Sequence, residues 1–267
     1  MASTVNRLSR LDRSVAGRVA IVTGAASGMG RATAHLFADE GAQVAVVDIG
    51  QERVDAVVSE IGAVHGESRS QGFAIDVTDT AALARMVSDV VDTWGRIDCL
   101  VNNAGVSMIS SLLQDDDGFV EAWRRTLDVN LSAYVHLARL VVPVMKGVGY
   151  GRIVNIASTE SIVATGGIAA YSASKAGVTG LTRSMAVELG RFGITANCVC
   201  PGPISTGMTS GITDEAKTAY AKRKVPLRRY GDPEEVAHMT LSLCLPAASF
   251  TNGATVVVDG GMTVRHT

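Results

Sequence analysis

Tyr171 and Lys175 stand four residues apart, in the segment Tyr-Ser-Ala-Ser-Lys. Residues at this spacing share one face of a helix, so the phenol and the ammonium are expected to point the same way. A free tyrosine has a pKa of about 10, and lowering it to about 7 requires roughly 4 kcal/mol of stabilisation of the phenolate. A fixed lysine cation in a partly dry site can supply that stabilisation. Alone, the pair fits a proton-transfer site and an ordinary tyrosine with an exposed lysine equally well.

Ser158 strengthens the proton-transfer interpretation, because it directly follows a predicted strand that ends at Ile156. Its hydroxyl is expected at the carboxyl edge of a sheet, within reach of a substrate oxygen. Asn130 is predicted to lie in a helix and to bind a water that connects Lys175 to solvent. Glu160, two residues past Ser158, either touches a polar or cationic substrate group or faces solvent.

A glycine-rich turn follows the first predicted strand and opens a helix. Glycines allow a sharp turn and a close approach of a diphosphate, and the helix N-terminus adds free N–H groups. The strand before the turn and the helix after it are the context that gives such a motif its meaning. The residues expected to bind the dinucleotide here are Gly24, Ser27, Gly28, Met29 and Gly30.

Asp48 lies 18 residues after Gly30, at the end of the second predicted strand. A carboxylate at this place accepts hydrogen bonds from the adenosine ribose hydroxyls and repels a 2′-phosphate, which predicts NAD rather than NADP. Ser27 and Ile49 add no positive charge for a phosphate. Arg31 is the one nearby base, and it is expected to face solvent or the diphosphate. The simpler alternative is that Asp48 only caps the next helix.

These residues are positioned by short β-branched runs that alternate with helical stretches. Strands are predicted at 19–22, 43–48, 72–75, 99–101, 152–156, 194–199 and 254–258. Helices are predicted at 29–40, 51–61, 80–94, 119–146 and 169–192, and a last one follows the capping box Asp232-Pro233-Glu234-Glu235. The alternation predicts an α/β fold, a doubly wound seven-stranded parallel sheet of Rossmann-like type, in a single domain over 18–267.

Composition excludes several classes of function. The chain has 267 residues and a net charge of −2, so it has no basic excess for nucleic acid. No apolar run reaches the ~18 residues of a membrane span, and the histidines form no cluster that predicts a metal. Residues 1–17 are expected to be a short flexible leader rather than an organelle-targeting segment. The cysteines are expected to be buried, reduced thiols of a cytoplasmic protein; they are Cys99, Cys198, Cys200 and Cys244.

With these motifs together, the chain resembles the short-chain dehydrogenase/reductase family from about Arg18 to Met262. The matching elements are Thr23-Gly24-(three residues)-Gly28-Met29-Gly30, Asn102-Asn103-Ala104-Gly105, Asn130, Ser158, Tyr171-(three residues)-Lys175 and Pro201-Gly202. The resemblance implies a catalytic tetrad of Asn130, Ser158, Tyr171 and Lys175. It also implies that Asp76 and Val77 hold the adenine, that Asn103, Ala104 and Gly105 lie against the adenosine, and that Pro201, Gly202, Ile204 and Thr206 hold the nicotinamide. A homotetramer is implied as well, with the helices over 119–146 and 169–192 pairing between subunits.

The predicted activity is NAD(H)-dependent interconversion of a secondary alcohol and a ketone, with Ser158 and Tyr171 contacting the substrate. Residues 204–229 are expected to cover the substrate; Met208, Ile212 and Tyr220 there suggest a partly apolar molecule, alicyclic or steroid-like, although helical packing explains them equally well. Two alternatives stay open: an NADPH-dependent reductase of 3-oxoacyl or other ketones, and a dinucleotide-binding protein without catalysis. An enoyl reductase is disfavoured, since such family members usually space tyrosine and lysine more widely.

Overall fold

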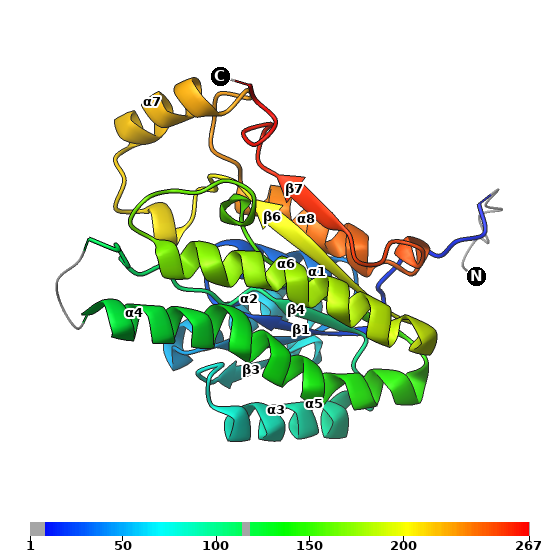
Figure 1. The fold of residues 1–267 in the computed structure, drawn as a ribbon. Helices are drawn as coiled ribbons and strands as arrows, with labels where there is room; N and C mark the ends of the chain where they lie inside the picture. The colour runs from blue at the N-terminus through cyan, green and yellow to red at the C-terminus, as the bar shows by residue number, and fades with distance from the viewer. Residues whose placement is uncertain (1–8, 114–117, 267) are drawn as a thin grey trace.

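Seven parallel strands form one sheet in the computed structural model, which describes residues 9–113 and 118–266 (Figure 1). Their order across the sheet is β3-β2-β1-β4-β5-β6-β7. The strands are β1 (Val19–Thr23), β2 (Gln43–Asp48), β3 (Ser70–Ala74), β4 (Cys99–Asn102), β5 (Gly151–Ile156), β6 (Ile194–Pro201) and β7 (Thr255–Val258). The predicted fold class, a seven-stranded parallel α/β sheet, is therefore confirmed.

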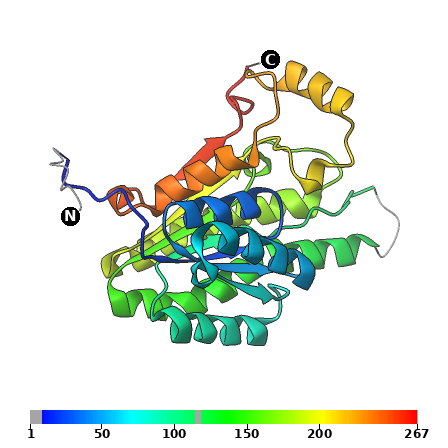
Figure 2. The ribbon, with the colours of Figure 1, turned by 180° about the vertical axis from the view of Figure 1, so that it is seen from behind.

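Helices cover both faces of the sheet. They are α1 (Gly28–Asp39), α2 (Gln51–His65), α3 (Thr80–Trp94), α4 (Gly118–Leu127), α5 (Ala133–Val148), α6 (Ala169–Leu189), α7 (Asp214–Lys224) and α8 (Pro233–Cys244). In Figure 1 α3, α5 and α6 lie in front of the sheet, and the view from behind shows α1, α2 and α8 (Figure 2). The helix predicted at 51–61 extends to His65, the largest of the shifts in predicted bounds.

Alternation of side chains along each strand builds the two halves of the core. In β1, Val19 and Ile21 pack into the cluster formed with α3, α5 and α6, whereas Ala20 and Val22 pack into the cluster formed with α1, α2 and α8. Successive residues of a strand point to opposite faces, so a strand covered on both sides must be apolar throughout. This is why the strands near the middle of the sheet read as unbroken apolar runs.

The helical region predicted at 119–146 is interrupted where α4 meets α5. Residues Asp128–Ser132 form a π-helical turn that contains Asn130, and such turns are frequent at functional sites. The continuous helix over residues 118–148 is long and apolar enough to span a membrane by composition alone. Leu137, Val141 and Met145 are buried against the sheet, so this helix is packed as a core helix of the domain.

The region expected to cover the substrate, residues 204–229, contains a helix, α7, that is not among the predicted helices. Helix α7 lies beyond the carboxyl edge of the sheet rather than against either face (Figure 1). The Thr213 hydroxyl caps it by accepting a hydrogen bond from the N–H of Ala216. Acidic residues fill its first turn and basic residues its last turn, which is the arrangement the helix dipole favours.

The segment predicted as a flexible leader, 1–17, lies partly outside the described residues, because residues 1–8 are not described. The rest of it contacts the domain. Val15 is fully buried, and the carbonyl of Asp12 accepts a hydrogen bond from the N–H of Ala247. Within the described residues, the chain therefore already packs onto the domain at Asp12 and Val15, before Arg18.

All four cysteines are free and buried, as the sequence predicts. Cys198 and Cys200 are two apart in β6, and both side chains face the small cluster that also contains Val178. Burial and the neighbouring thiol raise the pKa of Cys198. Among the described residues, no group of three or more histidine, cysteine or acidic side chains is placed to hold a metal ion.

Candidate functional site

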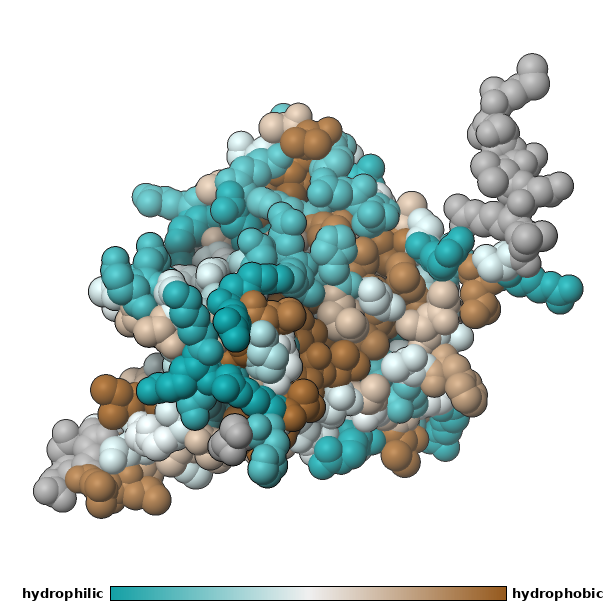
Figure 3. All heavy atoms as spheres, turned by 90° about the horizontal axis from the view of Figure 1, so that it is seen from above, coloured by the Kyte–Doolittle hydropathy of each residue, from teal (hydrophilic) through white to brown (hydrophobic). Residues whose placement is uncertain are grey.

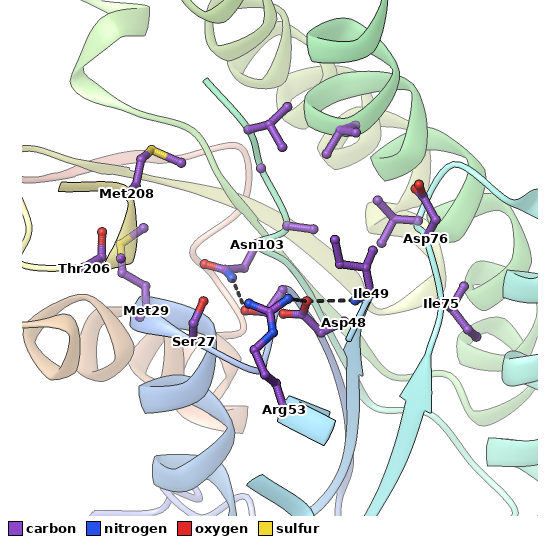
Figure 4. Close-up of a pocket in the computed structure, with 18 of the residues that line it drawn as sticks. Ser27, Met29, Asp48, Ile49, Arg53, Ile75, Asp76, Asn103, Thr206 and Met208 are labelled. Carbon is purple, nitrogen blue, oxygen red and sulfur yellow. Dashed lines mark hydrogen bonds and ion pairs between the residues drawn. The ribbon is translucent and has the colours of Figure 1, made fainter. Parts of the chain in front are cut away.

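Two cavities open at the carboxyl edge of the sheet, and Met208 lines both of them. We call the first the glycine-side cavity; its volume is about 270 Å³, and it lies where β1 and β4 are neighbours and the chain changes direction across the sheet (Figure 4). The second, the tyrosine-side cavity, has a volume of about 920 Å³ and contains Ser158 and Tyr171. Ligands of open α/β sheets bind where the strand order reverses, which is the position of the glycine-side cavity.

The glycine-side cavity brings together most of the residues predicted to bind the dinucleotide. The predicted residues that line it are Gly24, Ser27, Gly28, Met29, Asp48, Ile49, Asp76, Val77, Asn103, Ala104, Gly105 and Thr206. The predicted cofactor residues that do not line it are Gly30, Tyr171, Lys175, Pro201, Gly202 and Ile204. Tyr171 and Gly202 line the tyrosine-side cavity instead.

Gly30 and Ile204 differ from the other predicted cofactor residues because their side-chain positions belong to packing. A Cβ on Gly30 would lie 2.5 Å from Nδ2 of Asn103, so only glycine allows α1 to approach the end of β4. The side chain of Ile204 is buried in the core cluster between the sheet, α1 and α8. Both positions therefore support the shape of the cavity without lining it.

The floor of the glycine-side cavity is fixed by hydrogen bonds between the ends of β1 and β4. The Thr23 hydroxyl accepts hydrogen bonds from the N–H groups of Asn103, at 2.9 Å, and Ala104, at 3.0 Å. The Asn103 amide donates to the carbonyl of Thr23, at 2.9 Å, and to that of Gly24, at 3.3 Å. Each strand end holds the other, so the backbone around the cavity is rigid without any ligand contact being needed.

Asp48 lies at the end of β2, where the sequence predicts it, and only 11% of its side chain is exposed. Its carboxylate accepts hydrogen bonds from the N–H groups of Ala26, at 3.0 Å, and Ile49, at 2.8 Å. Arg53 forms an ion pair with it, with 3.3 Å between Nη2 and Oδ1, and also lines the cavity (Figure 4). The prediction that Arg31 is the one nearby base is therefore wrong, since Arg31 instead forms a two-point ion pair with Glu60.

Asp76 has a basic partner, Arg125, that sequence reasoning missed. Arg125 of α4 donates from Nη2 to Oδ2 of Asp76 at 2.8 Å, and both residues line the cavity. Burial acts to raise the pKa of Asp76, but hydrogen bonds from Thr78 and Arg125 outweigh it and hold that pKa below its ordinary value. The residues are 49 apart in sequence, so no local pattern could have indicated the pair.

Ser158 and Tyr171 share the tyrosine-side cavity. Burial raises the pKa of Tyr171; a hydrogen bond from Ser158 opposes the rise, and the negative charge of Glu160 adds to it. Burial is thus the largest influence on the Tyr171 pKa in the protein itself, and the expectation that Lys175 brings it down towards 7 stays a prediction. The Lys175 ammonium nitrogen lies 5.6 Å from the centre of the Tyr171 ring, on the same side of α6.

Lys175 and Asn130 meet beside Gly105. Lys175 is 3% exposed, its Nζ donates to the carbonyl of Ile156 at 2.8 Å, and burial lowers its pKa to about 8. The Asn130 side chain accepts from the N–H of Val106 at 2.8 Å and donates to the same residue's carbonyl at 2.9 Å. A Cβ on Gly105 would lie 3.5 Å from both Asn130 Oδ1 and Lys175 Nζ, so glycine leaves a space where these groups converge.

Glu160 has hydrogen-bond partners within the protein that the sequence did not indicate, and its contact with a substrate group stays a prediction. Its carboxylate accepts hydrogen bonds from the N–H of Thr165, at 2.9 Å, from the Thr165 hydroxyl, at 2.7 Å, and from the Ser172 hydroxyl, at 3.0 Å. It also lines the tyrosine-side cavity. Glu160 therefore ties the loop after β5 to the start of α6, and its charge lies beside Tyr171.

Comparison with known proteins places the chain among oxidoreductases. Residues 24–263 match a family model described as enoyl-(acyl carrier protein) reductase. The chain is 39% identical to a 3-oxoacyl-(acyl-carrier-protein) reductase of Thermotoga maritima, over 93% of this chain and 98% of the relative. It is 37% identical to a D-threitol dehydrogenase of Mycolicibacterium smegmatis, over 96% and 95%. A crystal structure of a provisionally assigned gluconate dehydrogenase of Agrobacterium tumefaciens superposes with a TM-score of 0.89, 32% identity and coverage of 96% of this chain and 100% of that one.

Proposed function

Because the chain belongs to the short-chain dehydrogenase/reductase family, we propose that it interconverts a secondary alcohol and a ketone by NAD(H)-dependent hydride transfer. The observation that carries the proposal is the presence of Ser158 and Tyr171 in one cavity that shares Met208 with the glycine-side cavity. The substrates named for the relatives differ widely, so family membership supports an oxidoreductase and leaves the substrate to this chain's own residues.

The residues of the glycine-side cavity fit a dinucleotide in their chemistry. Ser27, Gly28 and Met29 line it at the start of α1, whose first turn carries no acidic residue that would repel a diphosphate. The Asp48 carboxylate is placed to accept hydrogen bonds from ribose hydroxyls. NAD bound there would supply the nicotinamide ring that accepts or donates the hydride.

In alcohol oxidation, Tyr171 acts as the general base and removes the hydroxyl proton, while Ser158 donates a hydrogen bond to the same substrate oxygen. In ketone reduction, Tyr171 returns that proton to the oxygen. Since burial raises the pKa of Tyr171, the phenolate needs a nearby positive charge. Lys175, whose pKa of about 8 leaves it mostly protonated at pH 7, supplies that charge from the same helix.

We assign Asn130 to the path by which the proton leaves the site beside Lys175. Its side chain is held by Val106 and also donates to the Ser174 hydroxyl at 3.1 Å, which keeps the π-helical turn next to α6. The space beside Gly105 is bounded by Asn130 and Lys175, and a water there would connect the ammonium with solvent.

The preference for NAD over NADP rests on Asp48, and Arg53 is the observation that favours the second candidate function, an NADPH-dependent ketoreductase. Arg53 is 54% exposed and can leave Asp48 without disrupting any core packing. A free Arg53 could bind a 2′-phosphate, but the Asp48 carboxylate would remain beside that phosphate and repel it. The nearly buried carboxylate therefore favours NAD.

We also propose a homotetramer in the cytoplasm. On α4, Val120 and Trp123 are exposed, and on α6 Val187 is exposed, so these helices offer apolar surface for pairing between subunits. The buried, unpaired cysteines are typical of a reducing compartment. Light scattering at micromolar concentration measures the mass; a monomer would contradict the pairing.

The decisive experiment is a screen of dinucleotide reduction, by absorbance at the nicotinamide band, over secondary alcohols that include cyclic alcohols and sterols. NAD⁺ and NADP⁺ are compared with each alcohol, and an enoyl thioester with NADH and NADPH tests the description of the matched family model. We expect turnover with NAD⁺ and a much lower rate with NADP⁺. A preference for NADP⁺ would support the second candidate, whereas dinucleotide binding without turnover of any compound would support a non-catalytic protein.

A further inference from the structure

One face of α7 forms a wall of the tyrosine-side cavity. The residues of α7 that line the cavity are Ala216, Ala219, Tyr220 and Arg223, a spacing of three, four and seven residues that places them on one side of a helix. The helix lies beyond the carboxyl edge of the sheet (Figure 1), so this side faces the cavity that holds Ser158 and Tyr171. Arg223 therefore contributes a permanent positive charge to the cavity.

Glu160 and Arg223 are the only charged residues among those described as lining this cavity. The two Glu160 oxygens are engaged by Thr165 and Ser172. Within residues 9–113 and 118–266, the exposed Arg223 side chain forms no ion pair and donates no hydrogen bond, while Arg265 donates to its main-chain carbonyl. The cavity thus has a negative charge beside Tyr171 and an unpaired positive charge on the wall formed by α7.

The surface between these charges is largely apolar. Tyr220 and Tyr230 pack edge to face with 6.1 Å between ring centres, and the Tyr220 hydroxyl contacts the Met262 sulfur at 3.5 Å. Met208 and Ile212 complete this part of the wall. In the view from above, hydrophobic side chains are visible near the middle of this face, among hydrophilic ones (Figure 3).

We propose that the substrate is a hydroxy or oxo acid whose carboxylate binds Arg223, with an apolar body between the carboxylate and the carbon that reacts at Tyr171. This inference rests on the proposed function and names its substrate class. A guanidinium binds a carboxylate through two parallel hydrogen bonds, which fixes both affinity and orientation. The charge of Glu160 repels a carboxylate next to Tyr171, so acids with the hydroxyl adjacent to the carboxylate are excluded.

Two matched pairs of ketones test the assignment: 4-oxocyclohexanecarboxylate with its methyl ester, and 5-oxohexanoate with its methyl ester. Binding of each to the enzyme with NAD⁺, which cannot reduce a ketone, is measured by calorimetry, and turnover with NADH is measured separately. We expect the wild type to bind each acid about tenfold more tightly than its ester, and Arg223→Gln to lower that ratio about tenfold. Arg223→Lys should retain part of the preference for the acid over its ester. Lys224→Gln, which removes the same charge from an exposed position that lines neither cavity, is the matched control and keeps the full ratio.

Equal binding of acids and esters by the wild type would overturn the inference, as would an unchanged ratio in Arg223→Gln. Failure of the proposed function has a different signature, because then neither acids nor esters are reduced although NADH binds. Reduction of the esters without any preference for the acids would support the proposed oxidoreductase activity and contradict only the binding of a substrate carboxylate by Arg223.

Discussion

The glycine-side and tyrosine-side cavities meet at Met208, but they are built in different ways. The first is formed by the ends of adjacent strands, and hydrogen bonds such as those between Thr23 and Asn103 fix its backbone. The second is closed by the loop around Glu160 and by α7, which lie outside the sheet. The sheet therefore determines where a dinucleotide can bind, whereas the chain beyond the sheet determines which substrate can reach Tyr171.

The largest expected effect separates catalysis from dinucleotide binding. Tyr171→Phe removes the proton donor and acceptor but keeps the ring, so turnover should fall by about 10³-fold. Because Tyr171 lines only the tyrosine-side cavity, the Kd of NADH, measured by fluorescence, should change less than about twofold. Turnover close to that of the wild type would remove Tyr171 from the role of acid and base.

The next effect concerns the glycine-side cavity alone. Asp48→Asn keeps an acceptor for only one of the N–H groups of Ala26 and Ile49, which bind different carboxylate oxygens, and it removes the charge and frees Arg53. The ratio of kcat/KM for NAD⁺ to that for NADP⁺ should fall by about 10- to 100-fold. The substitution removes charge-assisted hydrogen bonds to the ribose of NAD⁺, and it also removes the repulsion of the 2′-phosphate of NADP⁺. Arg53→Gln should raise the ratio slightly.

Arg31→Gln is the control for this experiment, since Arg31 lies near the same turn but pairs with Glu60. It should leave the ratio unchanged. An unaltered ratio in Asp48→Asn would mean that Asp48 only organises the turn and that cofactor choice is set elsewhere.

The contrast between the cavities also explains what the sequence could predict. Apolar strands and the glycine-rich turn are dictated locally, so the parallel sheet and the residues of that turn were predictable from local patterns, whereas Asp76 and the segment Asn103-Ala104-Gly105 came only from the family resemblance. Arg53 lies within five residues of Asp48, and its position in the first turn of the next helix was a signal that could have found it. The pair of Asp76 with Arg125 joins distant segments, and no sequence pattern reports it.

Helix α7 was missed for another reason. It has a single buried residue, Ala221, and therefore no apolar stripe to reveal a helical period. The cap at Thr213, the acidic first turn and the basic last turn were the available signals. The direction of the Tyr171 pKa was also beyond the sequence, because burial, the largest influence on it, depends on the complete fold.

A smaller effect concerns the folding free energy that is lost by burying the Lys175 cation near Tyr171. The fall in the pKa of Lys175 from 10.5 to about 8 corresponds to roughly 3 kcal/mol of folding free energy at pH 7. Lys175→Met should therefore be more stable at pH 7 by about 1–2 kcal/mol, after allowance for the lost hydrogen bond to Ile156. Its turnover should fall sharply.

The pH dependence of the extra stability of Lys175→Met shows whether it arises from removing the buried charge. The folded wild type carries the charge below pH 8, so the gain is complete there; it should decrease as the pH rises from 8 towards 10.5, where the amine becomes neutral without cost. Urea denaturation at several pH values measures the difference, with exposed Lys224→Met as a control that should show no such trend. A gain that is absent at pH 7, or that grows with pH, would contradict the assignment.

The smallest effect tests whether the chain outside the sheet responds separately from the strand ends. Asp232 caps α8 just after the segment that lines the tyrosine-side cavity, and Glu235 closes the capping box by accepting from the N–H of Asp232 at 2.8 Å. Asp79 caps α3, two residues after Val77 of the glycine-side cavity and outside the tyrosine-side cavity, by accepting from the N–H groups of Ala81 and Ala82. Each residue changed to alanine should cost about 1 kcal/mol of unfolding free energy. Only Asp232→Ala should also raise the KM of the alcohol, by about twofold, with the Kd of NADH unchanged; equal effects of both variants on KM would mean that the substrate segment is as firmly held by the sheet as the glycine-rich turn.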